Sequence, residues 1–175
     1  IGAKELTVKH KIKYDKGRIS VKNKYFSLQM IPRTPDQMEA FYYARGFPPN
    51  MLKEIREFCL ITTGLKNLSQ DIIWLEVADW QFSADGKPVK RFHRKTLLDR
   101  WKTMKIPLRS QSTFRWTLLP EALDYQPDEA EGGNIILPQV SGPITLHAEF
   151  ASGADKRGPR VKVMLDNLRC AEDPQ

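Results

Sequence analysis

The chain has 175 residues, of which 41% are hydrophobic and 28% are charged, and its formal net charge is +7. This length and composition are those of a globular protein and predict a single domain over residues 1–175. No segment approaches the ~20 apolar residues needed to cross a bilayer, so a transmembrane segment is not expected.

Residues 5–14 alternate in the manner of a half-buried strand with a charged outer face. The apolar side holds Leu6, Val8, His10, Ile12 and Tyr14, and the solvent side holds Lys9, Lys11 and Lys13. These lysines would also protect a sheet edge from pairing. After a predicted hairpin turn at 15–17, a second strand is predicted from Ile19 to Met30, with a β-bulge near Asn23 where the alternation changes phase.

A small helical insertion is predicted over residues 34–57. Thr34 has the features of an N-cap, Pro35 suits the first helical position, and Gln37 completes a capping box. Gly46 suits the C-terminal end of this helix. A second short helix is predicted over 50–57, and its buried side would hold Met51, Leu52 and Ile55.

Two central strands are predicted at 58–65 and 71–83, joined by a polar turn. In the second strand apolar side chains occupy both faces, so we expect it to be covered on both sides. Beyond a turn at Asp85-Gly86, the spacing predicts a short helix near 95–104 and then a strand through Phe114, Trp116 and Leu118.

The last third of the chain predicts three more strands. A polar loop at 127–133 leads into an apolar run at 135–137, and alternation returns at 144–150 and 161–165. About eight strands separated by turn signals predict a mainly β protein, either an antiparallel sandwich or a barrel.

Cys59 and Cys170 lie near the first central strand and the last strand. An even number of cysteines is compatible with one disulfide in an oxidising compartment. Two buried free thiols would give the same pattern, because unpaired cysteine is often buried. The sequence leaves both alternatives open.

Two stretches resemble bacterial secreted or cell-envelope immunoglobulin-like domains. Within 58–86, an apolar strand is followed by Lys66-Asn67-Leu68-Ser69, a Trp- and Leu-rich strand and an Asp-Gly turn. Within 118–169, a Gly132-Gly133 loop leads to an Ile/Leu strand and then to Pro143-Ile144-Thr145-Leu146. The resemblance implies an antiparallel immunoglobulin-like β-sandwich outside the cytoplasm, and it implies no activity. The position of Cys170 and the helices at 34–57 depart from a true immunoglobulin domain.

Few residues form a catalytic pattern. His147 and Glu149 form an H-x-E pair, but the alternation of their strand indicates a solvent-facing pair. The five methionines fit apolar stripes, which favours core packing over copper binding. The sequence contains no nucleophile elbow, phosphate-binding glycine loop or zinc motif. We therefore expect no enzyme activity, no cofactor and no metal site.

The strongest functional signal is the basic segment 87–115, which holds ten Lys or Arg residues and one acid, Asp99. Together with the N-terminal lysines, this segment predicts a basic face for an acidic protein partner or an anionic envelope polymer. The candidate residues of this face are Lys9, Lys11, Lys13, Arg91, Arg94, Lys95, Arg100, Trp101 and Arg115.

The predicted function is a non-catalytic binding or scaffolding module of the bacterial cell envelope, periplasmic or extracellular. Because the chain begins with Ile1 and not with Met, we expect that its original N-terminus was removed, and the sequence leaves open whether a signal peptide, a lipobox or a further domain preceded it. The alternative is a nucleic-acid-binding protein that uses the basic and aromatic side chains of 87–115.

Overall fold

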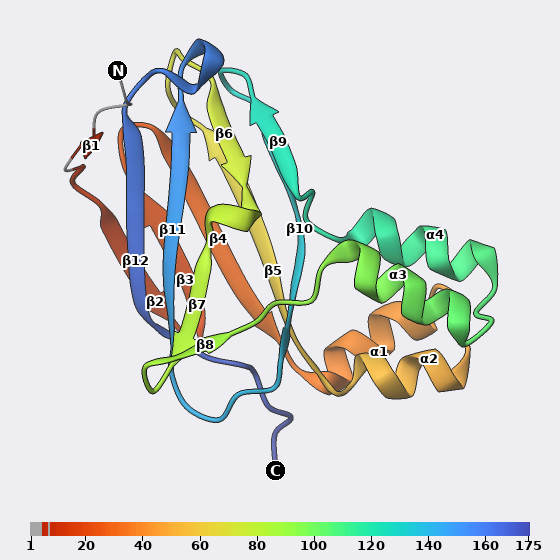
Figure 1. Ribbon diagram of the computed structural model, residues 1–175. Coiled ribbons are helices and arrows are strands. Elements are labelled where there is room, and N and C mark those ends of the chain that lie inside the picture. Colours follow the sequence, from red (N-terminus) through yellow and green to blue (C-terminus); the bar gives the residue numbers. More distant parts are fainter. Residues whose placement is uncertain (1–4, 7) are drawn as a thin grey trace.

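Two facing β-sheets and a lobe of four helices make up the fold, as the computed structural model shows for residues 5–6 and 8–175 (Figure 1). Within these residues one sheet has five strands in the order β10-β5-β4-β3-β2. The other has seven, in the order β1-β12-β11-β6-β9, with β7 paired to β11 and β8 paired to β7. Every described strand pair is antiparallel except β1 with β12. The predicted mainly β, sandwich architecture is confirmed.

The strands have the following bounds. The five-stranded sheet contains β2 (Lys11–Asp15), β3 (Arg18–Lys22), β4 (Phe26–Arg33), β5 (Phe58–Asn67) and β10 (Ala130–Pro138). The seven-stranded sheet contains β1 (Glu5–Leu6), β6 (Ile73–Glu76), β7 (Gln81–Ala84), β8 (Lys87–Val89), β9 (Ala122–Tyr125), β11 (Ile144–Ser152) and β12 (Arg160–Leu168).

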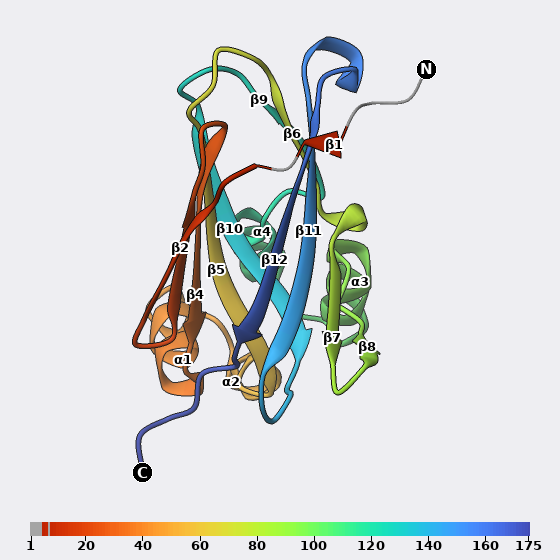
Figure 2. The same ribbon diagram turned by 90° about the vertical axis from the view of Figure 1, so that its left-hand side faces the viewer.

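The main core lies between the two sheets, which Figure 2 shows edge-on. Alternate residues of β4 and β5 point inward, and they meet the inward residues of β11 and β12. Phe26 of the first sheet lies against Phe150 of the second, with ring centroids 4.3 Å apart, and both side chains are fully buried. The sheets are therefore held together by the apolar face that the strand alternation predicts.

The first helical pair, α1 (Pro35–Tyr43) and α2 (Pro49–Ile55), lies between β4 and β5 in the sequence. The predicted capping box is confirmed, because Thr34 Oγ1 accepts from the Gln37 amide and Gln37 Oε1 accepts from the Thr34 amide. Gly46 has a φ of +80°, and the Phe47 amide returns to the carbonyl of Tyr42. That hydrogen bond closes the helix as a C-terminal glycine does in a Schellman motif.

The second pair, α3 (Arg94–Thr103) and α4 (Leu108–Thr117), lies between β8 and β9. The helix predicted near 95–104 is confirmed as α3. The strand predicted through Phe114 and Leu118 is wrong, because residues 108–117 are helical. Phe114 and Leu118 are buried while Trp116 is 85% exposed. Helical residues two apart point in nearly opposite directions, so α4 buries Phe114 and exposes Trp116, while Leu118 follows the helix in an extended conformation.

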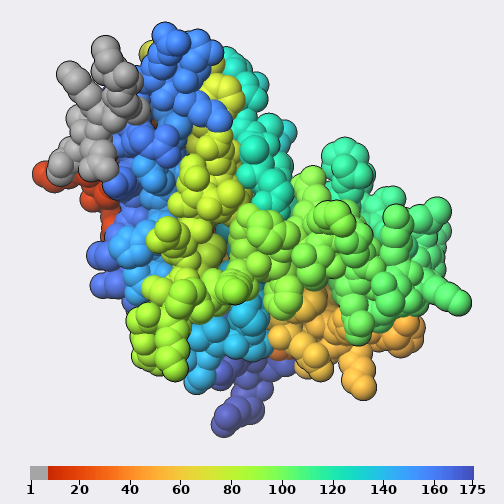
Figure 3. Space-filling view, in the orientation of Figure 1, coloured from red at the N-terminus to blue at the C-terminus, as the bar shows by residue number. Residues whose placement is uncertain are grey.

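Both helical pairs pack into one lobe with a core of its own. Figure 3 shows this lobe projecting from the side of the sandwich. Trp101 is fully buried at its centre, 5.3 Å from the ring of Phe114 in an edge-to-face contact. Leu60 of β5 and Ile136 of β10 extend this core onto the outer face of the five-stranded sheet.

Three further strand predictions need correction, and the first concerns residues 71–83. This segment forms two strands separated by a 3₁₀ turn (Val77–Asp79). Leu75 and Val77 are buried with Trp80 and Phe82, whereas Ala78 is exposed. The turn shifts the phase of the alternation, so both halves face the same core and the strand is not covered on both sides.

The other two corrections concern the N-terminal third. The segment 5–14 divides between two sheets, because β1 pairs with β12 and β2 pairs with β3. Ile12 is 38% exposed and Tyr14 is 43% exposed, so β2 is not half-buried; the predicted inward side chain of Leu6 lies outside the described residues. Near Asn23 the chain turns into a hairpin instead of a bulge, and Asn23 Oδ1 accepts from the amides at 25 and 26.

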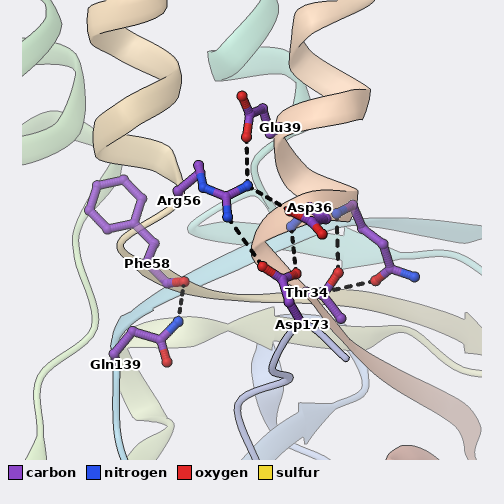
Figure 4. Close-up of polar contacts among 8 residues, drawn as sticks. Thr34, Asp36, Glu39, Arg56, Phe58, Gln139 and Asp173 are labelled. Carbon is purple, nitrogen blue, oxygen red and sulfur yellow. Dashed lines mark hydrogen bonds and ion pairs between the residues drawn. The ribbon is translucent and has the colours of Figure 1, made fainter. Parts of the chain in front are cut away.

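The C-terminal tail is fixed to the base of the helical lobe. A disulfide joins Cys59 to Cys170, 111 residues apart, which resolves the cysteine alternatives in favour of the bridge. Arg56 forms ion pairs with Asp36, Glu39 and Asp173 (Figure 4). Asp173 also accepts from the Asp36 amide in the first turn of α1, and this hydrogen bond lowers the pKa of Asp173.

Candidate functional site

A basic groove runs between α3 and α4, with a volume of about 410 Å³. Its cationic lining side chains are Arg94, Lys95, Lys102 and Arg115, and the only acid among the lining residues is Asp99. Lys95 Nζ pairs with Asp99 Oδ2 at 2.7 Å, which raises the pKa of Lys95 and lowers that of Asp99. Because this one acid is already paired, the groove keeps a strong excess of positive charge.

One polar atom of Arg94, a residue that lines the groove, lacks a hydrogen-bond partner in the part of the chain that the structure describes. Its Nε is buried and has no hydrogen-bond partner among the described residues. A buried guanidinium nitrogen without a partner is costly. The structure thus brings together the predicted residues Arg94, Lys95 and Arg115, and it adds Lys102, which was not singled out in the sequence.

Two other predicted arginines are occupied by partners elsewhere. Arg91 donates through both terminal nitrogens to Glu121, at 2.8 and 2.6 Å. Burial alone would raise the pKa of Glu121, but the hydrogen bonds and charge of Arg91 outweigh it and lower the pKa. Arg100 pairs with Glu54 of α2 and ties the two helical pairs together. Arg91 is therefore paired and largely buried, whereas Arg100 is paired with Glu54 but remains 54% exposed at the surface.

Trp101 is also unavailable, because its side chain is fully buried in the lobe core. Phe114 of the same basic segment is buried against it, and Phe92 packs on Phe58. Two of the aromatic side chains that segment 87–115 was expected to offer for stacking are therefore core residues, and the third, Phe92, is half-buried against the core.

The N-terminal lysines do not share a surface with the groove. Lys11 and Lys13 lie on β2 and Lys9 precedes it, and all three are exposed. β2 is one edge of the five-stranded sheet, and β10, next to the helical lobe, is the other. Four strand spacings of about 4.8 Å separate these edges by roughly 19 Å. The single basic face expected from the sequence is therefore two separate basic surfaces.

A second concave site lies between α1, α4 and the outer face of β4, β5 and β10. We call it the aromatic cleft; its volume is about 480 Å³. Two of its lining side chains are exposed aromatics, Phe41 (41% exposed) and Trp116 (85% exposed). Among the residues that the structure describes, Arg33 is the one cationic lining residue and no acid lines the cleft. This cleft was not predicted from the sequence, because Trp116 was assigned to a strand.

The H-x-E pair lies on the outer face of β11, as the alternation predicted. His147 is exposed, and Glu149 accepts from Arg160 Nε at 2.6 Å. In the part of the chain that the structure describes, no group of three His, Cys, Asp or Glu side chains is placed to hold a metal ion. Among the same residues, no helix combines the length and apolarity of a membrane span.

Comparisons with known proteins add little to this geometry. No protein-family model and no curated protein matches the chain. Among solved structures, the chain is similar to a "putative lipoprotein (ycdA)" from Bacillus subtilis subsp. subtilis str. 168, with 10% identity and a TM-score of 0.34. The match covers 91% of this chain but 34% of that one, so this chain spans about a third of its length. A TM-score this low carries no argument about fold family or function.

Proposed function

We propose that this protein is a non-catalytic binding module of the bacterial cell envelope, with an immunoglobulin-like sandwich as its scaffold. The disulfide between Cys59 and Cys170 supports a periplasmic or extracellular location, because disulfides persist in oxidising compartments. The two facing antiparallel sheets support the sandwich scaffold.

The observation that carries the proposal is the basic groove between α3 and α4. Arg94, Lys95, Lys102 and Arg115 converge there with one acid, which Lys95 already neutralises. A local excess of positive charge attracts an acidic protein surface or an anionic polymer and steers its approach. The helices that present these side chains are anchored by Trp101 and Phe114, so the charges are held on a rigid support.

The test is binding of labelled poly-L-glutamate and of heparin, measured by fluorescence anisotropy at 50 and 200 mM salt. The groove variant is Lys102→Glu/Arg115→Glu, and the matched control is Lys11→Glu/Lys13→Glu, which reverses the same number of exposed charges on β2. We expect the groove variant to lose about tenfold in affinity, because two lost ion pairs and new repulsion amount to about 1.4 kcal/mol or more. Equal losses in both variants would show that net charge, and not the groove, drives binding.

Nucleic-acid binding through 87–115 is the second candidate, and one observation disfavours it. Trp101 and Phe114 are buried and Phe92 is half-buried against Phe58, so none of these three side chains is freely exposed for stacking on bases. A labelled single-stranded oligonucleotide at 20 mM salt tests it directly. Binding tighter than that of poly-L-glutamate, with a steep salt dependence, would favour the nucleic-acid function over the envelope function.

A further inference from the structure

The floor of the aromatic cleft is the outer face of the five-stranded sheet. Asn134 of β10 lies opposite Thr62 of β5, and Arg33 of β4 lies one row further along, opposite Leu60. In the other direction the next row is Gly132 opposite Gly64, with Gln29 of β4 opposite Gly64 on its other side, so only β5 and β10 lack side chains there. The walls are α1 and α4, which carry Phe41 and Trp116. A volume of about 480 Å³ lies within the range of small-molecule sites.

A chain of side-chain hydrogen bonds crosses this floor. Arg33 Nε donates to Thr62 Oγ1 at 3.0 Å, and Thr62 Oγ1 donates to Asn134 Oδ1 at 2.9 Å. Asn134 Nδ2 then donates to the Tyr42 hydroxyl at 3.3 Å, and that hydroxyl lies 2.6 Å from Thr117 Oγ1.

The direction of this chain follows from its last member. Thr117 Oγ1 donates its only proton to the carbonyl of Phe114 at 2.7 Å, so the Tyr42 hydroxyl must be the donor to Thr117. Burial raises the pKa of Tyr42, which keeps this donor protonated. Each hydrogen bond of the series is therefore donated in the direction from Arg33 toward Thr117. This order fixes the orientation of the neutral polar groups of the floor.

The hydrogen bond to Thr62 holds the Arg33 side chain in place, but no paired acid among the described residues neutralises its charge. Its Nε is used by Thr62, and neither terminal nitrogen has a hydrogen bond or an ion pair with any residue of the described chain. The lining of the cleft contains no acid that could pair with it. A planar guanidinium with two free terminal nitrogens matches a carboxylate in a bidentate geometry. A single cation balances one negative charge, which favours a carboxylate over a doubly charged phosphate monoester.

The aromatic walls indicate what the rest of the ligand is. An indole that is 85% exposed presents a flat apolar surface to solvent, and Phe41 adds a second aromatic edge. A sugar ring has an apolar face of C–H groups that packs on such a surface, and hydroxyl groups on its rim. The neutral hydroxyl and amide groups of Thr62 and Asn134 on the floor suit those hydroxyls.

We infer that the aromatic cleft binds a saccharide that carries a carboxylate, of the uronic acid class. The carboxylate pairs with Arg33, the sugar ring packs on Trp116, and the ring hydroxyls bond to the amide of Asn134. This site is separate from the α3–α4 groove and does not depend on binding there: Trp116 lines the cleft, whereas its neighbour Arg115 lines the groove.

The experiment measures binding of tri-galacturonate and of its methyl ester by calorimetry at 150 mM salt. The ester removes the charge and keeps the rings and hydroxyls, and we expect it to bind about tenfold or more weakly than the acid. Arg33→Gln should weaken binding of the acid by a similar factor and leave the ester unchanged. Trp116→Ala should weaken both ligands; because its side chain is 85% exposed, this variant should fold normally.

Two controls separate the cleft from other surfaces. Tyr43→Ala removes an aromatic of α1 that is 72% exposed and does not line the cleft, and it should leave binding unchanged. Lys102→Glu/Arg115→Glu should also leave it unchanged, so that failure of the groove and failure of the cleft are distinguishable. No binding of the acid at 1 mM, equal binding of acid and ester, or tighter binding of a nucleoside monophosphate would overturn the inference.

Discussion

Removal of the disulfide is expected to destabilise the protein by about 3–5 kcal/mol. The bridge joins Cys59, at the start of β5, to Cys170, which follows β12, and so links the ends of the two sheets. In the polymer description of a crosslink, closing a loop of 111 residues removes unfolded-state entropy equivalent to about 4.8 kcal/mol at 25 °C. This is a large part of the ~5–15 kcal/mol that stabilises a typical domain.

Two variants separate the crosslink from the packing of the sulfur atoms. Cys170→Ala breaks the bridge but leaves the thiol of Cys59, which is 1% exposed, in the core. Cys59→Ala/Cys170→Ala also removes that thiol and should cost up to ~1 kcal/mol more, since it leaves a small cavity.

Urea unfolding, followed by tryptophan fluorescence, measures these losses, because Trp80 and Trp101 are buried and report on the two cores. Oxidised protein should unfold at a much higher urea concentration than either variant or than protein treated with a reducing agent. A change of less than ~1 kcal/mol in the free energy of unfolding on reduction would contradict the stabilising role of the disulfide. Two titratable thiols in the native protein would contradict the disulfide itself.

Three further predictions concern single side chains. Tyr42→Phe should lose about 1–3 kcal/mol in urea unfolding, because it removes the hydrogen bonds of a buried hydroxyl to Asn134 and Thr117, whereas Tyr43→Phe, at a 72% exposed position, should lose almost nothing; equal losses would contradict these hydrogen bonds. Thr34→Ala should lose about 1 kcal/mol by removing the N-cap of α1, and an unchanged melting curve would contradict that role. Burial and the charge of nearby Glu131 raise the pKa of Tyr125 to about 12, so the unfolded state should release its proton first. Stability should then fall from about pH 10 to 12, and Tyr125→Phe should lessen that fall; the same pH profile in both proteins would contradict it.

The parts of the fold that the sequence predicted well depend on local chemistry. The capping box at Thr34 and the glycine at 46 are satisfied within a few residues, so their signals do not need the rest of the chain. The long strand at 58–67 has alternating burial and β-branched residues, and it was predicted nearly to its ends.

Two of the errors have a common cause, which is that a short apolar pattern fits more than one period. Phe114, Trp116 and Leu118 fit a strand at i, i+2 and i+4, yet the outer two also fit a helix at i and i+4. The tertiary structure decides between them, because α4 must cover Trp101. In the same way, residues 71–83 looked like one strand with apolar side chains on both faces. The 3₁₀ turn between β6 and β7 shifts the phase of the alternation, so that both halves face the same core.

The candidate sites were predictable in composition but not in arrangement. The basic character of 87–115 was visible in the sequence. The glutamates that pair with Arg91 and Arg100, however, lie 30 and 46 residues away along the chain. The aromatic cleft draws on β4, α1, β5, α4 and β10, so no contiguous segment contains its pattern. Such a site becomes visible only when both helical insertions are placed on the same sheet.

The position of α4 explains why the basic groove and the aromatic cleft can be tested independently. Successive residues of a helix point about 100° apart, so Phe114, Arg115 and Trp116 leave α4 in three directions. Phe114 is fixed in the lobe core, which directs Arg115 to the groove beside α3 and Trp116 to the cleft beside α1. A substitution at Arg115 or Trp116 therefore alters one surface while Phe114 holds the helix in place. For this reason a loss of binding that is confined to one of the two variants identifies the surface that binds the ligand.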